Sequence, residues 1–180
     1  FVGLPGMSYH GGVVGAIIGA VVFAKRRHKS LLDIMDALIC CVPFAYTWGR
    51  LGNFFNAELY GRVTSSGIGM LFPPYSTQQF DTSLLWVQEI MQKCSISATG
   101  PYVNLPRHPS QLYEALFEGI VVDLILWLLV RPRMKRIAPG VTSGLYFVLY
   151  GTVRFFIEYF REPDMNIGFV IKGSYGADNI

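Results

Sequence analysis

Four long apolar stretches dominate this sequence of 180 residues and limit the folds open to it. They are Phe1–Ala24, Leu31–Trp48, Leu112–Val130 and Gly144–Phe160. A helix needs roughly 20 apolar residues, with a range of about 17–25, to cross the hydrocarbon core of a bilayer. Charged residues make up 15% of the chain, whereas a typical soluble domain has about 25%. These features predict an all-α, polytopic membrane protein with four spanning helices, and they disfavour a soluble protein with buried helices.

Basic residues directly follow two of the apolar stretches and predict the orientation of the chain. The segments Lys25–Lys29 and Arg131–Arg136 hold eight of the fifteen Lys and Arg residues. The positive-inside rule places both turns in the cytoplasm, so the first span runs inward. The long segment between the second and third spans then faces outward, as does the tail after Phe160. Because the basic residues lie in turns next to the membrane, we expect no nucleic-acid partner.

We expect one membrane-embedded domain over residues 1–180, with residues 63–108 forming a loop-rich external head. Pro and Gly pairs punctuate this head, and its middle, Ser83–Gln92, has the pattern of a short amphipathic helix. The chain begins in apolar sequence without an initiator Met, which indicates an internal part of a longer protein. Its three cysteines provide no disulfide framework.

Arg154 and Glu158 lie four residues apart in a stretch that is otherwise almost wholly apolar. Helical spacing puts both on one face, together with Tyr150. A charge at membrane depth costs about 2.5–3.5 kcal/mol on insertion scales, so a chain that keeps such charges usually has a use for them. Two interpretations are open: a structural ion pair that joins two helices, or a polar site that faces the interior of the bundle.

The densest polar signal in an apolar setting is the run GRLGNFFNAELYGR at residues 49–62. Its candidate binding residues are Arg50, Asn53, Glu58, Gly61 and Arg62. A planar guanidinium binds phosphate oxygens in bidentate fashion, so Arg50 and Arg154, from two different spans, are a candidate phosphate clamp. The glycines in this run permit a break in the helix or a close approach of the backbone to a ligand.

Two histidines are candidates for proton transfer. His10 lies at the outer end of the first span and His108 lies just before the third, and imidazole titrates near neutral pH. A lone histidine at a helix end is more often a capping or interfacial residue, and that alternative stays open for His10. Gln111, Glu114 and Glu118 share one face of the third span. Three scattered histidines without an HExxH motif indicate no catalytic metal, and no cofactor is expected.

Four segments of this chain together resemble one known family. They are YHGG at 9–12, the run at 49–62, RHPSQLYEA at 107–115 and YGTVRFFIEYFREPD at 150–164. The chain resembles the prolipoprotein diacylglyceryl transferases, bacterial inner-membrane enzymes with seven helices and a periplasmic head. This resemblance implies transfer of an sn-1,2-diacylglyceryl group from phosphatidylglycerol to the lipobox cysteine of a prolipoprotein signal peptide. It also implies a multi-pass protein in the lipid bilayer with its active site toward the periplasm, two spans before Phe1 and one after Ile180.

The resemblance also assigns roles to residues of this chain. It implies important roles for His10, Arg50, Asn53, Glu58, Gly61, Tyr150, Arg154 and Glu158. We expect catalytic roles for His10, Tyr150, Arg154 and Glu158, with His108 as a second candidate, and substrate-binding roles for Arg50, Asn53, Glu58, Gly61 and Arg62. Arg50 and Arg154 would hold the lipid phosphate, Glu158 would orient Arg154, and either histidine would take the proton of the thiol.

The sequence departs from the family pattern in two places, and two other functions are compatible with it. The chain has VTSSGIG at 63–69 where the family usually has prolines, and residues 165–180 do not match. A transporter or channel with an intramembrane anion site is the main alternative, although the sequence lacks the paired inverted repeats typical of transporters. A non-catalytic lipid-binding subunit is the other.

Overall fold

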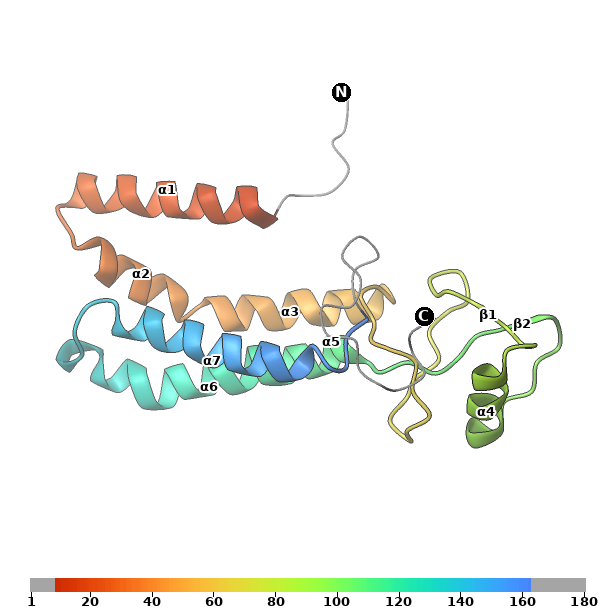
Figure 1. Cartoon of the computed structure of the whole chain (residues 1–180). Coiled ribbons are helices and arrows are strands. Elements are labelled where there is room, and N and C mark those ends of the chain that lie inside the picture. Colours follow the sequence, from red (N-terminus) through yellow and green to blue (C-terminus); the bar gives the residue numbers. More distant parts are fainter. Residues whose placement is uncertain (1–8, 163–180) are drawn as a thin grey trace, which may run out of the picture.

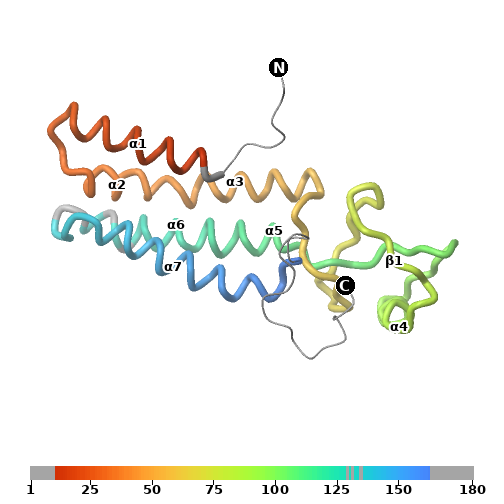
Figure 2. The backbone as a smooth tube through the Cα atoms, turned by 45° about the horizontal axis from the view of Figure 1, so that its top comes forward, coloured from red at the N-terminus to blue at the C-terminus, as the bar shows by residue number. Residues whose placement is uncertain are grey.

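The computed structural model describes residues 9–162, which form a set of long helices with a smaller head at one end (Figure 1). Helix α1 (Tyr9–Arg27) ends in three consecutive basic residues and turns back into α2 (Leu31–Ile39). Helix α3 (Val42–Phe55) continues from α2 in nearly the same direction. The smooth trace in Figure 2 shows the same long helices side by side, with the head beyond their ends.

The second apolar stretch forms two helices that meet at Cys40 and Cys41. Pro43 lies in the first turn of α3, and because proline has no N–H group it removes one bond from the helical ladder there. Helix α3 then runs through Gly49 and Gly52 to Phe55. The helix break that the glycines suggested is therefore absent, and Arg50 lies within a helix rather than in the external segment.

The third apolar stretch contains two π-helical sections. After α5 (Ser110–Tyr113) the elements in order are η1 (Glu114–Val121), α6 (Val122–Ile125), η2 (Leu126–Val130) and the 3₁₀ turn η3 (Arg131–Arg136), of which η1 and η2 are π-helical. A π-helical section is rare and often marks a functional site, because its wider turn redirects the side chains.

Helix α7 (Val141–Ile157) receives its N-terminal cap from another helix. The Asp36 side chain of α2 accepts hydrogen bonds from the N–H of Gly140 and the N–H of Ser143, both at 2.8 Å. It also accepts a bond from the Ser143 hydroxyl at 2.6 Å. Ser143 lies inside the first turn, while Gly140 occupies the cap position with a φ of +90°. A carboxylate at a helix N-terminus also interacts favourably with the helix dipole.

The core of the helical part lies between α2, α6, η2 and α7. Its buried members are Ile39, Val122, Leu126, Val130 and Tyr146. Helix α3 packs along η1, where Gly119 of η1 leaves no room for a β-carbon: an added one would lie 3.1 Å from the Cβ of Thr47. This close approach brings the polar residues of α3 and η1 together.

The head contains a short antiparallel sheet, so the fold is mostly helical rather than purely α. Strand β1 (Phe80–Asp81) pairs with β2 (Tyr102–Val103), and α4 (Leu85–Cys94) lies between them in sequence. The amphipathic helix expected at Ser83–Gln92 is therefore present, shifted by two residues. A separate small core fills the head, formed by Phe80, Val87, Val103 and Leu105.

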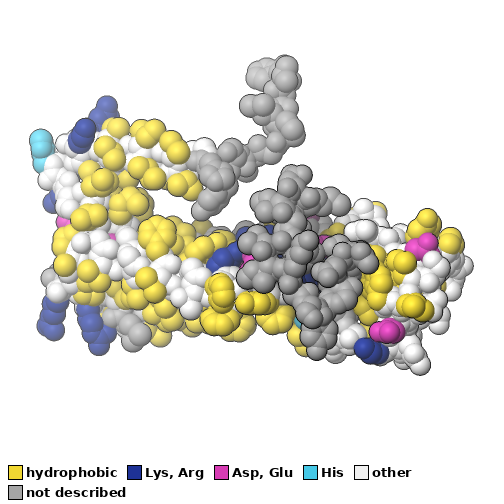
Figure 3. All heavy atoms as spheres, viewed as in Figure 1, with side chains coloured by type: hydrophobic (Ala, Val, Ile, Leu, Met, Phe, Trp, Pro, Cys, Tyr) yellow, Lys and Arg dark blue, Asp and Glu magenta, His cyan; other side chains and the backbone are white. Residues whose placement is uncertain are grey.

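Hydrophobic side chains cover much of the helical part, and Lys and Arg gather at the end away from the head (Figure 3). Among the described residues, the stretch Leu31–Phe55 is long and apolar enough to cross a membrane, and Val141–Ile157 is a shorter apolar helix. The number of spans and their direction across the bilayer remain predictions.

Candidate functional site

Tyr46 and Arg50 bring the first two polar side chains to the site. They lie one turn apart on α3, so both face η1. The guanidinium carbon of Arg50 lies 4.9 Å from the centre of the Tyr46 ring, within the range of a cation–π contact. The Nε atom of Arg50 lies 2.7 Å from Oε2 of Glu114, the first residue of η1.

Glu114 is the centre of the site, because three arginines from different segments meet its carboxylate. Besides Arg50, Nη1 of Arg154 on α7 lies 3.7 Å from Oε2, and Nε of Arg161 lies 3.4 Å from Oε1. The Glu114 side chain is fully buried. A buried carboxylate is tolerated when opposite charges compensate it, and here several guanidinium groups do so.

A second buried carboxylate, Glu118, lies one turn further along η1. The hydroxyl of Tyr46 donates a hydrogen bond to Oε2 of Glu118 and lies 3.1 Å from Oε2 of Glu114. Nη1 of Arg154 lies 3.9 Å from Oε1 of Glu118. Tyr46 thus bridges two acids that are both within reach of Arg154.

The residues that the sequence places on one face of α7, Tyr150, Arg154 and Glu158, lie beside this cluster. Nη2 of Arg154 lies 2.8 Å from Oε2 of Glu158, so the ion pair expected between them is present. Arg161 also approaches Glu158, at 3.6 Å. Tyr150 packs edge-on against the Tyr46 ring and stacks on Tyr146, which places it beside the same group of side chains.

The side chains of the three arginines remain partly exposed to solvent. Arg154 is 26% exposed, Arg50 17% and Arg161 14%, and Glu158 is 53% exposed. Each guanidinium has five N–H donors, so these ion pairs leave donors for an anion. The arrangement can therefore bind a phosphate in a setting of low polarity, where such contacts are strong.

A crossing of three chain segments lies next to this cluster. Gly61 donates its N–H to the carbonyl of His108 at 2.8 Å, and His108 donates its N–H to the carbonyl of Arg62 at 2.9 Å. Arg62 donates its backbone N–H to the carbonyl of Phe160 at 3.0 Å and its Nε–H to the carbonyl of Arg161 at 2.7 Å. The segment after α7 is thereby fixed against the end of the Gly49–Arg62 run.

His108 lies half-buried at this crossing, with its ring against the rings of Tyr113 and Phe160. Its Nδ1 atom lies 3.2 Å from the Tyr113 hydroxyl. Burial lowers the pKa of His108 below its ordinary value of 6.5, because the charged form loses hydration. The imidazole is therefore neutral at pH 7 and able to accept a proton.

Two expected site residues, Glu58 and Asn53, make no side-chain hydrogen bond or ion pair with the arginine cluster among the described residues. The Glu58 side chain is exposed in a turn where Ala57 and Leu59 both have positive φ, and the Glu58 carbonyl accepts a hydrogen bond from Gln111. Asn53 lies on α3, where its carbonyl accepts the N–H of Glu58 at 2.9 Å. His10 lies in the first turn of α1, and its side chain is outside the described part of the structure.

Sequence reasoning did not select Glu114, Tyr46 or Arg161 as site residues. A signal was present for Tyr46, which precedes Arg50 at i−4 and so shares a helix face with it. Arg161 lies beyond the end of α7, in an extended segment, so helical spacing does not predict its place. Within the described residues, His, Cys, Asp and Glu side chains form no group of three that could hold a metal ion.

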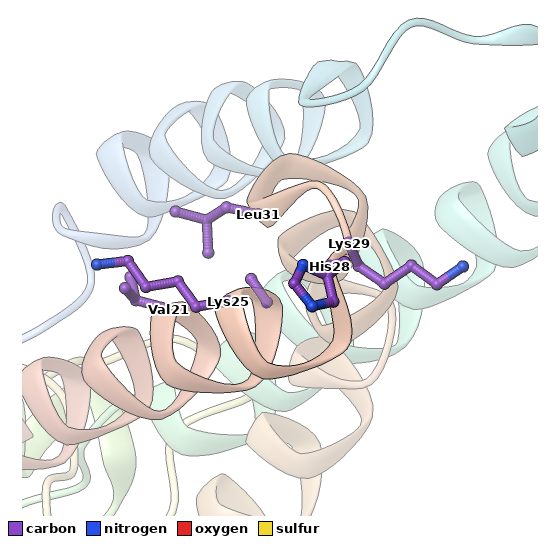
Figure 4. A pocket seen from close by; sticks show the side chains of 6 residues that line it. Val21, Lys25, His28, Lys29 and Leu31 are labelled. Atoms are coloured by element: carbon purple, nitrogen blue, oxygen red, sulfur yellow. The ribbon is translucent and has the colours of Figure 1, made fainter.

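A pocket at the turn between α1 and α2 is a separate feature (Figure 4). Its lining includes Lys25, His28, Lys29 and Leu31. The side chains of Lys25 and Lys29 extend in opposite directions, so they do not form a joint anion site.

Comparison with known proteins gives the same family as the sequence motifs. The profile of the family described as "Prolipoprotein diacylglyceryl transferase" matches residues 2–176. The chain belongs to this family. Among the proteins it is similar to is the phosphatidylglycerol–prolipoprotein diacylglyceryl transferase of Treponema denticola, 46% identical over the whole chain and 53% of the relative. Proteins of the same name from Treponema pallidum and Chlorobaculum tepidum are 49% and 48% identical over 94% of the chain, and 51% and 49% of their own length.

The chain thus spans about half the length of the curated diacylglyceryl transferases that it matches. Membership of this membrane-protein family agrees with the apolar helices of the structure.

Proposed function

We propose that the protein transfers an sn-1,2-diacylglyceryl group from phosphatidylglycerol to the lipobox cysteine of prolipoproteins. The single observation that carries this proposal is the convergence of Arg50 and Arg154, from two helices, on the buried carboxylate of Glu114. The names of the relatives, which include phosphatidylglycerol and prolipoprotein, support the choice of both substrates.

The reaction replaces a carbon–oxygen bond with a carbon–sulfur bond. The cysteine sulfur attacks the glyceryl carbon that carries the phosphate, the bond from this carbon to the phosphate oxygen breaks, and glycerol phosphate leaves. The thiol must first lose its proton, since a free thiol has a pKa of about 8.5. The chemistry therefore needs a base for the thiol and positive charge for the departing phosphate.

The described residues suit the second requirement. Arg50 and Arg154 bind the phosphate oxygens, and Glu158 holds Arg154 in orientation through its 2.8 Å ion pair. Tyr150 packs against this group, while Asn53, Glu58, Gly61 and Arg62 shape the binding region around it. His10 or His108 takes the thiol proton, and the neutral imidazole of His108 is in the right state to do so.

The proposal includes a location and an organisation for the whole protein. The enzyme is a multi-pass protein of the bacterial inner membrane, with residues 63–108 as a head on the periplasmic side. The gathering of Lys and Arg at the end away from the head supports this orientation. The arginine cluster, at the head end of the helices, then lies toward the periplasm.

Mass spectrometry of a lipobox peptide tests the proposal. The full-length protein in phosphatidylglycerol vesicles should add the mass of one diacylglyceryl group to the cysteine and release glycerol phosphate. Vesicles of phosphatidylcholine alone should give no adduct. A folded protein that forms no adduct from phosphatidylglycerol would contradict the transferase and favour an anion transporter.

A further inference from the structure

Arg107 is a large polar side chain buried in the head, outside the cluster described above. It is 1% exposed. Its guanidinium carbon lies 4.7 Å from the ring centre of Tyr60 and 5.4 Å from that of Phe80. Burying a charge is costly unless a partner compensates it, so such a position calls for a specific role.

The partner of Arg107 lies in the segment that follows α7. Nη1 of Arg107 lies 2.5 Å from Oε2 of Glu162 and 3.4 Å from the carbonyl of Gly61. Its Nε and Nη2 atoms make no hydrogen bond to the described residues, so Glu162 supplies the compensating charge. The backbone of Arg107 forms bridges with Val63 and Met70 of the head. One residue therefore fastens the segment after α7 to the head.

Glu162 is the immediate neighbour of Arg161, which reaches Glu114 and Glu158. Arg161 forms an antiparallel bridge with Gly61, so the chain is extended there. Successive side chains of an extended segment point to opposite sides. Glu162 accordingly points to the head, where it meets Arg107, while Arg161 points to the helical cluster.

We propose that the Arg107–Glu162 ion pair is a positioning device that holds Arg161 in the phosphate-binding cluster. With Arg161 in place, its guanidinium pairs with Oε1 of Glu114, on the opposite side of the carboxylate from Arg50. This shared pairing leaves donors of Arg50 and Arg154 for the lipid phosphate. The inference rests on the proposed function, and it adds a route by which the head controls the affinity for phosphatidylglycerol.

Steady-state kinetics of the full-length protein test this inference with three variants: Glu162→Gln, Arg161→Ala and the double variant. We expect Glu162→Gln to raise the KM for phosphatidylglycerol about tenfold with a smaller change in kcat. Because Glu162 acts through Arg161, the double variant should have the KM of Arg161→Ala alone. Glu89→Gln, an exposed carboxylate on α4, is the matched control and should keep the parental KM.

Two results would overturn the inference. One is a parental KM in Glu162→Gln; the other is a double variant whose KM rises by the product of the two single effects, which would mean that the residues act independently. If Glu162→Gln does not fold, Arg107→Lys is tested in its place, because lysine keeps the positive charge but lacks the planar guanidinium group. An inactive parent protein would instead reject the proposed function, so the two failures are distinguishable.

Discussion

At the scale of single residues, we expect Glu158 to contribute orientation of Arg154 rather than binding energy. It is 53% exposed and pairs with both Arg154 and Arg161. Exposed ion pairs contribute about 0.2–1 kcal/mol, so Glu158→Gln should leave the fold intact. We expect the KM for phosphatidylglycerol to rise about 1.4- to fivefold, which corresponds to that energy.

Initial rates at several lipid concentrations measure this effect. The control is Glu89→Gln. It removes an exposed carboxylate from helix α4 of the head, which contributes no residue to the arginine cluster, so the KM should stay at the parental value. An unchanged KM in Glu158→Gln would show that Arg154 keeps its orientation without this partner.

His108 gives the stability of the protein a pH dependence on the acid side. Burial lowers its pKa below 6.5, so the folded state binds the proton more weakly than the unfolded chain does. The contribution of His108 to the free energy of unfolding is therefore complete above pH 6.5 and falls as the pH drops through the lower pKa of the folded state.

Thermal unfolding of the parent and of His108→Gln measures this contribution. Between about pH 7.5 and about pH 5, the parent should lose more of its Tm than the variant does. Equal losses in the two proteins would mean that His108 titrates normally in the folded state.

At the scale of elements, the crossing of three segments at Gly61 depends on the absence of a side chain. A β-carbon at Gly61 would collide with the carbonyl oxygen of Phe160 and lie 2.9 Å from the Cβ of His108. Gly61→Ala should therefore lower the free energy of unfolding by about 1–3 kcal/mol and reduce transfer, since Arg161 shifts with the segment.

Gly67→Ala, in the adjoining head, is a matched control, because a β-carbon there meets nothing within 4 Å. Thermal unfolding and transfer rates should separate the two alanine variants clearly. Equal values for both would show that the crossing adapts without cost.

Helix positions followed from the apolar pattern, whereas helix breaks did not. The second apolar stretch divides at Cys40 and Cys41 because Pro43 interrupts the hydrogen-bond ladder, yet the glycines at 49 and 52 stay helical within α3. The cap of α7 comes from Asp36, about 100 residues earlier in the chain, and only tertiary structure brings the two together.

At the scale of the whole molecule, the basic turns and the head define opposite ends of the helices (Figure 3). We expect the head in the periplasm and the turn between α1 and α2 in the cytoplasm. Cysteine variants of the full-length protein without its native cysteines test this orientation. In intact spheroplasts, a membrane-impermeant maleimide should label Glu89→Cys, which is exposed on α4, and not His28→Cys, which is exposed in the turn.

Lysed membranes are the control, since both variants should then react. Labelling of His28→Cys in intact spheroplasts, without labelling of Glu89→Cys, would show that the orientation is the opposite of the one expected.

The helices that carry the site could be predicted from the sequence more completely than the centre of the site. Arg50, Arg154 and Glu158 stood out because charges are rare in apolar helices, and the structure brings them into one group. Glu114, on which the two arginines converge, stood out less, since its helix carries three acidic residues and only the packing of α3 on η1 selects between them. The exposure of Glu58 depends on the turn after α3, which sequence spacing does not determine.

The most direct test of the central claim is the initial rate of diacylglyceryl–cysteine formation in the full-length protein with Arg154→Ala. Removing a group that stabilises charge on a departing phosphate should lower this rate by about 100-fold or more. The helical circular-dichroism spectrum should stay the same, and Arg26→Gln, an exposed arginine at the opposite end, should keep the parental rate. If folded Arg154→Ala transfers the lipid at close to the parental rate, the arginine cluster is not the phosphate site.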